Sequence, residues 1–238
     1  MSPLENPSNM KTLLLFDLDG TLVLGDGAGR RAVVRAFALL YGAADDWESL
    51  DTAGRTDTAI FEDMLRRIGR EPAEAWSSRL WDTYVDCLID EVRQRPGRLA
   101  PGVRELLARC SPESGLYAAL GTGNLERGAR VKLAPHAIND PLPVGGFGSD
   151  TMDRAELVRV GVERARGYYR TDFDRIVVVG DTPRDAECAL VNGYACVLVA
   201  TGPYDASSLA RCGADAVLAD LSNTEAVLET IDKLPRRG

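Results

Sequence analysis

A chain of 238 residues with 45% hydrophobic and 27% charged residues has the composition of a soluble globular protein, long enough for one domain with an insertion or for two modest domains. Its formal net charge of −8 argues against binding to nucleic acid or to anionic membranes, because clustered Lys and Arg residues hold such ligands. The sequence therefore predicts neither a nucleic-acid nor a membrane partner, and it leaves the oligomeric state open.

The N-terminus and the cysteines indicate a cytoplasmic protein. Residues 1–10 are polar, contain Pro3 and Pro7, and lack the basic and apolar regions of a signal peptide, so we expect a flexible tail. The five cysteines are odd in number and form no CxxC pair, which is typical of free thiols in a reducing compartment. No run of residues is long and apolar enough to span a bilayer.

The first predicted element is a short buried strand followed by two acidic residues. Residues 13–16 form a continuous apolar run, and Gly20 marks the turn that ends it. Asp17 and Asp19 come directly after the run. Ligands bind at the carboxyl ends of strands in open parallel sheets, so these aspartates belong either to a turn or to a reactive site.

The segment of residues 24–98 differs from the rest of the chain. Helical patterns at 29–42 and 72–95 are accompanied by Trp47, Trp76 and Trp81, and no convincing strand is present. This predicts an inserted all-helical cap domain, with an α/β core formed by residues 11–23 and 99–238. The cap is either a stability or oligomerisation module or a lid over the carboxyl end of the sheet.

Within this segment, the sequence AGRTDT at residues 53–58 contains an arginine, Arg55, in a predicted loop. Arg55 either binds an anionic group of a ligand or lies exposed. On the second interpretation, Thr56 or Asp57 simply caps the helix that follows.

The remainder of the chain alternates strands with helices. Strands are predicted at residues 116–122, 175–181, 194–201 and 214–219, and helices at 102–110, 153–167 and 183–193. This alternation predicts βαβ units and a parallel sheet, which is an α/β fold of the Rossmann-like type.

Polar motifs also follow two of the later strands, GTGN at 121–124 and GDTPRDA at 180–186. Each is explained by helix capping when taken alone: Thr122 can begin a helix, and Thr182 with Asp185 fits an N-cap and its first turn. Capping does not explain why all of these motifs would meet at one edge of one sheet. The polar side chains expected there are those of Asp17, Asp19, Thr122, Asp181 and Asp185.

This set of side chains suits phosphoryl transfer. Clustered carboxylates repel one another unless a cation lies among them, and hard oxygen ligands suit Mg2+, which commonly pairs with phosphate. One carboxylate can attack phosphorus, while a second donates a proton to the leaving alcohol and later takes one from water. A hydroxyl, backbone N–H groups and a fixed cation would complete the binding of the phosphoryl oxygens.

The motifs DLDGT at 17–21, GTGN and GDTPRD, in this order, resemble the haloacid dehalogenase-like hydrolase superfamily. They are most similar to its phosphatases of the phosphoglycolate phosphatase-like type, which have a helical cap, and the resemblance covers nearly all of the chain from residue 12. It implies a Mg2+-dependent phosphatase that hydrolyses a small phosphorylated metabolite through an aspartyl-phosphate intermediate.

The resemblance also assigns roles to individual residues. Asp17 would be the nucleophile, and Asp19 would be the general acid/base and give a backbone carbonyl to Mg2+. Asp181 would be a further metal ligand, supported by Asp185. The phosphoryl group would be held by residues of the GTGN motif, namely Thr122, Gly123 and Asn124. The stretch AGRTDT resembles the one that such caps present to the substrate, so Arg55 would reach a carboxylate or second phosphate on the leaving group.

The family also has a basic residue, usually lysine, beside the nucleophile. The only lysines are Lys11, Lys132 and Lys233; Lys132 lies 49 positions before Asp181, whereas Arg154 lies 27 before it, closer to the usual arrangement of the family. We therefore predict Arg154, and not Lys132, as the catalytic cation. The alternative is a solvated arginine at the start of a helix.

Other functions are compatible with such a fold. A haloacid dehalogenase needs no acid like Asp19, and a phosphonate-cleaving relative needs a cap lysine, which is absent between Lys11 and Lys132. A sugar phosphomutase stays open, because only the cap decides whether water or a sugar accepts the phosphoryl group. A noncatalytic binding module would have no reason to keep Asp17, Asp19 and Asp181.

Overall fold

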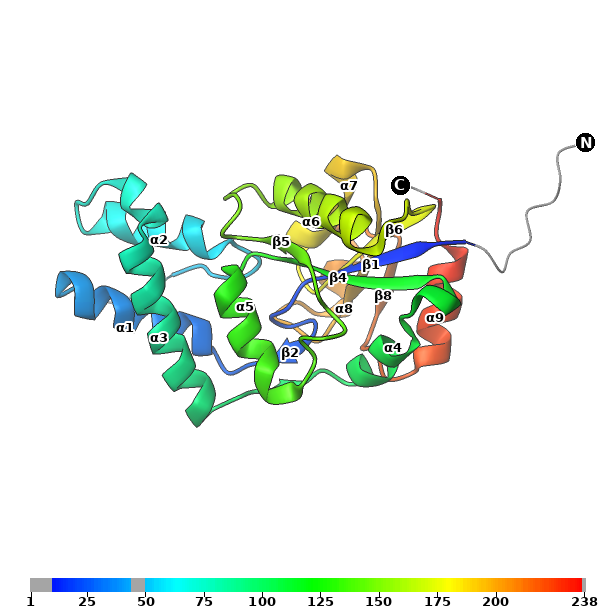
Figure 1. The fold of residues 1–238 in the computed structure, drawn as a ribbon, viewed down its shortest axis with the longest axis horizontal. Helices are drawn as coiled ribbons and strands as arrows, with labels where there is room; N and C mark the ends of the chain where they lie inside the picture. The colour runs from blue at the N-terminus through cyan, green and yellow to red at the C-terminus, as the bar shows by residue number, and fades with distance from the viewer. Residues whose placement is uncertain (1–9, 44–49, 237–238) are drawn as a thin grey trace, which may run out of the picture.

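The computed structural model describes residues 10–43 and 50–236 (Figure 1). Trp47 and all but the last residue of the tail expected at residues 1–10 lie outside these ranges. Within them, no helix combines the length and the apolar character needed to cross a membrane.

A six-stranded parallel sheet forms the centre of the molecule, in the order β5-β4-β1-β6-β7-β8. Its strands are β1 (Thr12–Phe16), β4 (Leu116–Thr122), β5 (Gly145–Phe147), β6 (Arg175–Gly180), β7 (Ala195–Val199) and β8 (Ala216–Leu218). The chain winds in opposite directions from β1, first to β4 and later to β6. The carboxyl ends of β1 and β6 therefore flank the switch point at which such sheets bind ligands.

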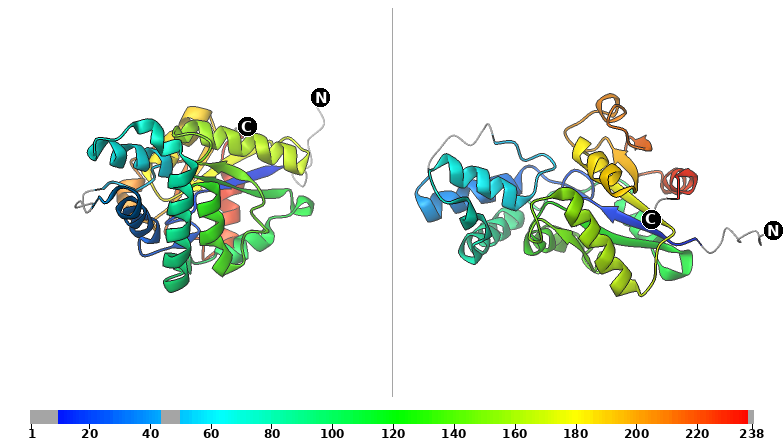
Figure 2. Two further views of the ribbon diagram at one scale, coloured as in Figure 1. Left: turned by 60° about the vertical axis from the view of Figure 1, so that its left-hand side comes forward. Right: turned by 90° about the horizontal axis from the view of Figure 1, so that it is seen from above.

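Helices cover both faces of the sheet (Figure 2). One face packs against α6 (Arg154–Tyr169), α7 (Pro183–Asn192) and α8 (Ala206–Leu209), and the other against α4 (Val103–Arg109), α5 (Glu126–Leu133) and α9 (Thr224–Lys233). Two short 3-10 turns, η4 (Pro112–Ser114) and η5 (Ala134–His136), connect these elements. The predicted Rossmann-like α/β fold is thereby confirmed.

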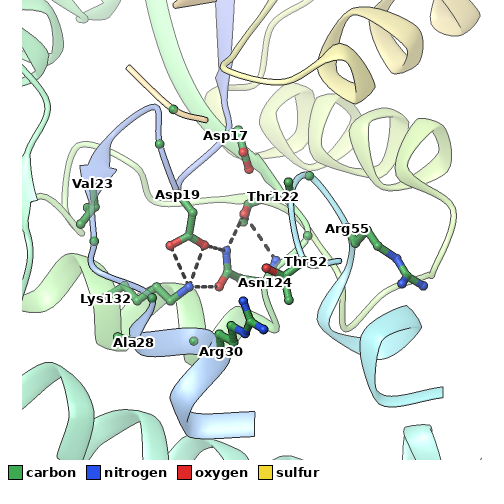
Figure 3. A pocket seen from close by; sticks show the side chains of 18 of the residues that line it. Asp17, Asp19, Val23, Ala28, Arg30, Thr52, Arg55, Thr122, Asn124 and Lys132 are labelled. Carbon is green, nitrogen blue, oxygen red and sulfur yellow. Dashed lines mark hydrogen bonds and ion pairs between the residues drawn. The ribbon is translucent and has the colours of Figure 1, made fainter. Parts of the chain in front are cut away.

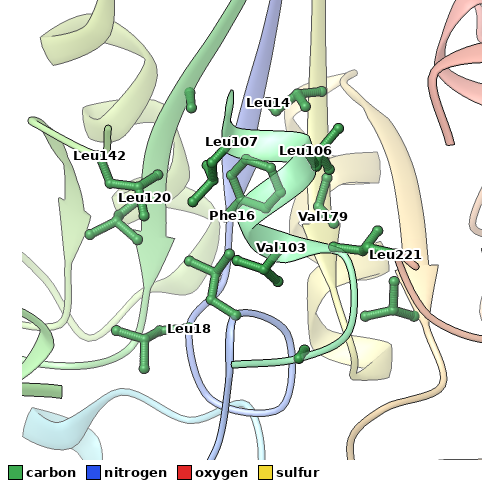
Figure 4. Close-up of a cluster of buried hydrophobic side chains, with 14 of the residues drawn as sticks. Leu14, Phe16, Leu18, Val103, Leu106, Leu107, Leu120, Leu142, Val179 and Leu221 are labelled. Carbon is green, nitrogen blue, oxygen red and sulfur yellow. The ribbon is translucent and has the colours of Figure 1, made fainter. Parts of the chain in front are cut away.

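The continuous apolar run of β1 follows from burial on both faces of the sheet. Leu14 and Phe16 pack with Leu106 of α4 in one cluster (Figure 4), whereas Leu13 and Leu15 belong to the cluster on the opposite face. All of these side chains are buried. A strand packed in this way holds the residue that follows it in a fixed position.

Three local predictions are wrong. β5 is missed, because its sequence GGF has no apolar periodicity and becomes a strand only by pairing with β4. α6 continues past Gly167 and stops at Arg170, which adopts a left-handed conformation; an open, uncrowded Gly167 weakens a helix without ending it. The helix expected over 72–95 is divided at Ser77, whose backbone is extended.

Between β2 (Val23–Leu24) and β3 (Arg98–Leu99) the described chain is helical, with α1 (Ala28–Tyr41), α2 (Asp57–Arg67), η3 (Pro72–Trp76) and α3 (Ser78–Gln94). These helices share a hydrophobic cluster of their own around Phe37, Phe61 and Tyr84. β2 and β3 pair antiparallel, so the ends of the segment predicted to lack strands do contain them. We call residues 24–98 the cap; its limits stay a prediction.

The cap lies against the carboxyl end of the sheet through the loop that precedes α2. The backbone N–H of Asp57 donates to the carbonyl of Gly123 at 2.7 Å, and the hydroxyl of Thr58 donates to the carbonyl of Gly148 at 2.8 Å. A Cβ at Gly123 would collide with the carbonyl of Arg55. Glycine in the GTGN motif thus permits the cap backbone to approach this closely.

Candidate active site

Three buried carboxylates meet where β1 and β6 end. Asp17 follows β1 and its N–H donates to the carbonyl of Val179 in β6 at 2.8 Å, while Asp181 follows β6 itself. Asp185 lies in the first turn of α7. One oxygen from each of these three carboxylates lies within 4.8 Å of the others. The residues predicted for one sheet edge from separate motifs are therefore brought together.

The turn after β1 is shaped around Asp181. Gly20 has a φ of +86°, and a Cβ at this residue, as at Gly202, would collide with the carboxylate of Asp181. The hydroxyl of Thr21 donates to that carboxylate at 3.1 Å. Glycine and threonine in the DLDGT motif thus allow Asp181 to lie directly beneath the turn that carries Asp19.

The electrostatics of this cluster favour a bound cation. Burial, followed by the charges of the neighbouring Asp17 and Asp185, raises the pKa of Asp181 to about 8. Burial also raises the pKa of Asp17 to about 6, although Arg154 opposes this shift. Buried carboxylates that resist ionisation next to one another form an oxygen-only site that suits a hard divalent cation.

Arg154, the first residue of α6, reaches into the cluster from the side. Its guanidinium donates to Asp185, lies 3.2 Å from Oδ1 of Asp17, and donates to the carbonyl of Gly54 in the cap at 3.2 Å. Only 11% of its side chain is exposed. The alternative of a solvated arginine is therefore wrong, and one guanidinium connects two site carboxylates with the cap.

Asp185 combines both of the interpretations that its motif left open. Its Oδ2 accepts hydrogen bonds from the N–H of Thr182 at 3.0 Å and from the Thr182 hydroxyl at 2.7 Å, which caps α7. Its Oδ1 accepts from Arg154. Because both oxygens already have partners within the protein, Asp185 is suited to support the site.

A second cation that the sequence interpretation set aside lies on the cap side of the site. Nζ of Lys132 in α5 donates to both carboxylate oxygens of Asp19, at 2.9 and 2.7 Å, and to Oδ1 of Asn124 at 2.7 Å (Figure 3). Nδ2 of Asn124 in turn donates to Asp19 at 2.8 Å and to the Thr122 hydroxyl at 2.9 Å. The prediction of one cation at the site, Arg154, is therefore incomplete, because Lys132 also lies there.

The sequence does contain a signal for Lys132. Residues 128, 129, 132 and 133 form the buried face of α5, so this lysine lies on the apolar side of an amphipathic helix. A lysine is almost never buried without a partner. Weighing its position on the helix, in place of its distance along the chain from Asp181, would have identified it.

A cavity of about 450 Å³ separates these residues from the cap. Arg55 contributes to its wall but forms an ion pair with Asp63 at 2.6 Å and points away from Asp17 in Figure 3. Thr56 caps α2 by accepting from the N–H of Ala59, as the capping interpretation predicted. The guanidinium of Arg30 from α1, which sequence reasoning missed, points into the cavity.

The structure is a Rossmann-like α/β fold with an acidic cluster at the carboxyl end of its parallel sheet, and comparison with known proteins identifies its family. A model of the haloacid dehalogenase-like hydrolase family matches residues 14–190, and a second hydrolase-like model of the same family matches residues 157–224. Since the first match covers most of the chain, the protein belongs to the haloacid dehalogenase-like hydrolase family. No curated protein matches the chain.

Solved structures resemble the whole chain in fold. A hydrolase from Pseudomonas syringae is 22% identical with a TM-score of 0.69, covering 93% of this chain and 99% of its own. CbbY from Rhodobacter sphaeroides in complex with xylulose-1,5-bisphosphate is 18% identical with a TM-score of 0.71, covering 90% and 96%. A protein from Bacteroides vulgatus assigned as a beta-phosphoglucomutase is 20% identical with a TM-score of 0.60, covering 94% and 89%.

The raised pKa of Asp181 predicts a pH-dependent stability of the metal-free protein. The pKa rises from 3.8 to about 8 on folding, so between these values the folded state holds a proton that the unfolded chain has released. The free energy of unfolding should therefore fall as the pH rises through this window. At pH 8 in a chelator, Asp181→Asn should be more stable than the wild type by on the order of a few kcal/mol.

Urea denaturation at pH 5 and pH 8, with chelator or with Mg2+, measures this effect. Mg2+ should stabilise the wild type but not Asp181→Asn, and replacing the exposed Asp140 by Asn should alter neither behaviour. Equal stabilities of wild type and Asp181→Asn at pH 8 in chelator would contradict the prediction.

Proposed function

We propose that the protein is a Mg2+-dependent phosphatase of small phosphomonoesters that works through an aspartyl-phosphate on Asp17. The observation that carries this proposal is a cluster of three buried carboxylates beside Arg154, at the end of the sheet that faces the cavity. The cluster consists of Asp17, Asp181 and Asp185. Membership of the hydrolase family supports it. A cytoplasmic location, inferred from the free cysteines, belongs to the same proposal.

The donor set fits Mg2+. Asp17 and Asp181 would supply carboxylate oxygens, Asp19 would add its backbone carbonyl, and Asp185 would hold neighbouring groups. All of these are hard oxygen donors, and burial, together with the neighbouring carboxylates, raises the pKa values of Asp17 and Asp181. When bound, Mg2+ supplies positive charge that favours ionised carboxylates and binds phosphoryl oxygens.

The chain's own residues would then perform two displacements at phosphorus. A carboxylate oxygen of Asp17 attacks phosphorus as the bond to the leaving oxygen breaks, and Asp19 gives that oxygen a proton. Asp19 then takes a proton from water, whose oxygen attacks phosphorus and breaks the bond to Asp17. The products are the alcohol and inorganic phosphate, and both aspartates return to their starting forms.

Two further groups would bind the phosphoryl oxygens during these steps. The Thr122 hydroxyl accepts from Asn124 and still has its own hydrogen to donate. Arg154 lies within reach of Asp17 and would stabilise the charge that develops on the phosphoryl group. The N–H groups around Gly123 are suited to the same task.

The cavity favours a small phosphorylated metabolite as the substrate. Its volume of about 450 Å³ accommodates a small leaving group, and Arg30 gives its cap side a positive charge. The CbbY neighbour binds a sugar bisphosphate. A sugar phosphomutase would share the first displacement, and phosphate release against transfer to a sugar in a bisphosphate-primed assay distinguishes the two reactions.

Replacing each of the two aspartates of the DLDGT motif should separate nucleophile from acid/base. Asp17→Asn should abolish turnover and phosphoenzyme, because an amide is a poor nucleophile. Asp19→Asn should be about 10²-fold slower or more, yet it should still be phosphorylated by p-nitrophenyl phosphate, whose leaving group needs no proton. Rapid quench with labelled substrate should therefore trap hydroxylamine-sensitive label on Asp17 in Asp19→Asn only. Label in the Asp17→Asn variant would show that the roles of nucleophile and acid/base are assigned the wrong way round.

Arg154→Ala should lower kcat by about 10²-fold or more, the scale for one lost electrostatic stabiliser. Arg159→Ala is the matched control, because Arg159 lies on the same helix and pairs with Glu156 and Glu163 at the surface. Phosphate release from a panel of phosphomonoesters measures both variants. A similar loss of kcat in both variants would show that Arg154 stabilises α6 and does not take part in the reaction.

The two cap arginines should differ in their effect on substrate preference. Arg30→Ala should raise KM for substrates with a second anionic group about 10-fold, on the scale of one charge-assisted hydrogen bond, and change p-nitrophenyl phosphate hydrolysis little. Arg55→Ala should change preference less, since the Arg55 side chain points away from Asp17 whereas that of Arg30 points into the cavity. The comparison is kcat/KM for each substrate, and a larger change in preference from Arg55→Ala would reverse this assignment.

A further inference from the structure

We propose that Lys132 is the positioning residue for Asp19, so that the site uses two cations, one for each aspartate of the DLDGT motif. The proposal rests on the proposed function, since it assigns a part in the same two displacements. The inference adds to the proposed function a separate cation for each aspartate, with Lys132 supporting the acid/base and Arg154 supporting the nucleophile.

Asp19 needs such support because its side chain is exposed, and among the described residues Lys132 is the one cation that binds it, beside the amide of Asn124. Half of its side chain, 51%, is exposed on the cavity side, whereas 6% of the Asp17 side chain is exposed. An exposed carboxylate is free to change rotamer, which moves its oxygens by more than a hydrogen-bond length. Lys132 and Asn124 hold both oxygens of Asp19 through three hydrogen bonds of 2.7 to 2.9 Å.

Lys132 is itself rigidly placed. Only 8% of its side chain is exposed, and its Nζ also donates to Asn124, whose amide bonds to the Thr122 hydroxyl. The ammonium therefore links the acid/base to the residue proposed to hold the phosphoryl group. A displacement of Lys132 would move Asp19 relative to the phosphorus and leave the packing of Asp17 unchanged.

The cap completes the surroundings of this lysine. Helix α1 passes so close that a Cβ at Gly29 would lie 3.2 Å from Nζ of Lys132. Helix α3 packs on α5 from the other side, with Leu88 3.4 Å from the Cβ position of Gly128. Helices of the cap thus shield the Lys132 end of the ion pair from water, while the Asp19 end faces the cavity, and the partial shielding strengthens the ion pair.

Arg154 cannot replace Lys132 in this role. Its partners are Asp17, Asp185 and the carbonyl of Gly54, whereas those of Lys132 are Asp19 and Asn124. Loss of Lys132 should therefore affect the steps in which Asp19 moves a proton. The attack of Asp17 on a substrate whose leaving group needs no proton should remain.

A double-mutant cycle tests the proposal with Lys132→Met, Asp19→Asn and the double variant. Steady-state turnover and the phosphoenzyme burst are measured with p-nitrophenyl phosphate, and turnover is also measured with an alkyl phosphate. Lys132→Met should retain the burst, lose turnover of the aryl ester by about 10²-fold, and lose more with the alkyl ester. The double variant should be no slower than Asp19→Asn alone.

The proposal is overturned if the losses of turnover in Lys132→Met and Asp19→Asn multiply in the double variant, or if Lys132→Met loses the burst. Either result would mean that Lys132 acts elsewhere. Lys233→Met, which removes an exposed lysine, should behave as wild type. If Lys132→Met does not fold, Lys132→Arg keeps the charge and enters the same cycle; its bulkier fork beside Gly29 should also misplace Asp19.

The failure of the two proposals can be distinguished. Wild-type protein that forms no phosphoenzyme overturns the proposed function and this inference with it. The inference alone is overturned if Lys132→Met turns over normally while the wild type and Asp19→Asn both form phosphoenzyme.

Discussion

The mutual repulsion of buried carboxylates is the constraint around which the site is built. Asp17, Asp181 and Asp185 are fixed by strands β1 and β6 and by the first turn of α7, so none of them can move away from the others. Their negative charge has to be balanced where it stands. Arg154 provides part of that balance, and the rest calls for a cation among the oxygens.

Packing of the sheet makes this arrangement possible. The side chains of β1 alternate between two hydrophobic clusters, which anchor the strand from both faces up to Phe16. The energy of that packing holds Asp17 in a position that its own electrostatics oppose. Stability gained in the core thereby offsets the electrostatic cost of the buried carboxylates at this edge of the sheet.

Most of the sheet was predicted from the sequence, because five of its strands are apolar runs with turn residues beside them. β5 was not, since the sequence GGF gains its structure only from its neighbour β4. Among the site residues, motifs led to Asp17, Asp19 and Asp181. Lys132 could be identified only from its place on the apolar face of α5, whereas Arg30 lies on a helix of ordinary pattern. Arg30 reaches the cavity through the tertiary placement of α1, which one sequence does not encode locally.

The hydrogen bond between Asp57 and the carbonyl of Gly123 ties the cap to the loop proposed to grip the phosphate. For a cap that works as a lid, withdrawal would have to break this bond, so the departure of a product would coincide with loosening of the loop proposed to hold it. Entry and exit would then be coupled to assembly of that loop. Wherever that motion is slower than the chemistry, turnover depends on the viscosity of the solvent.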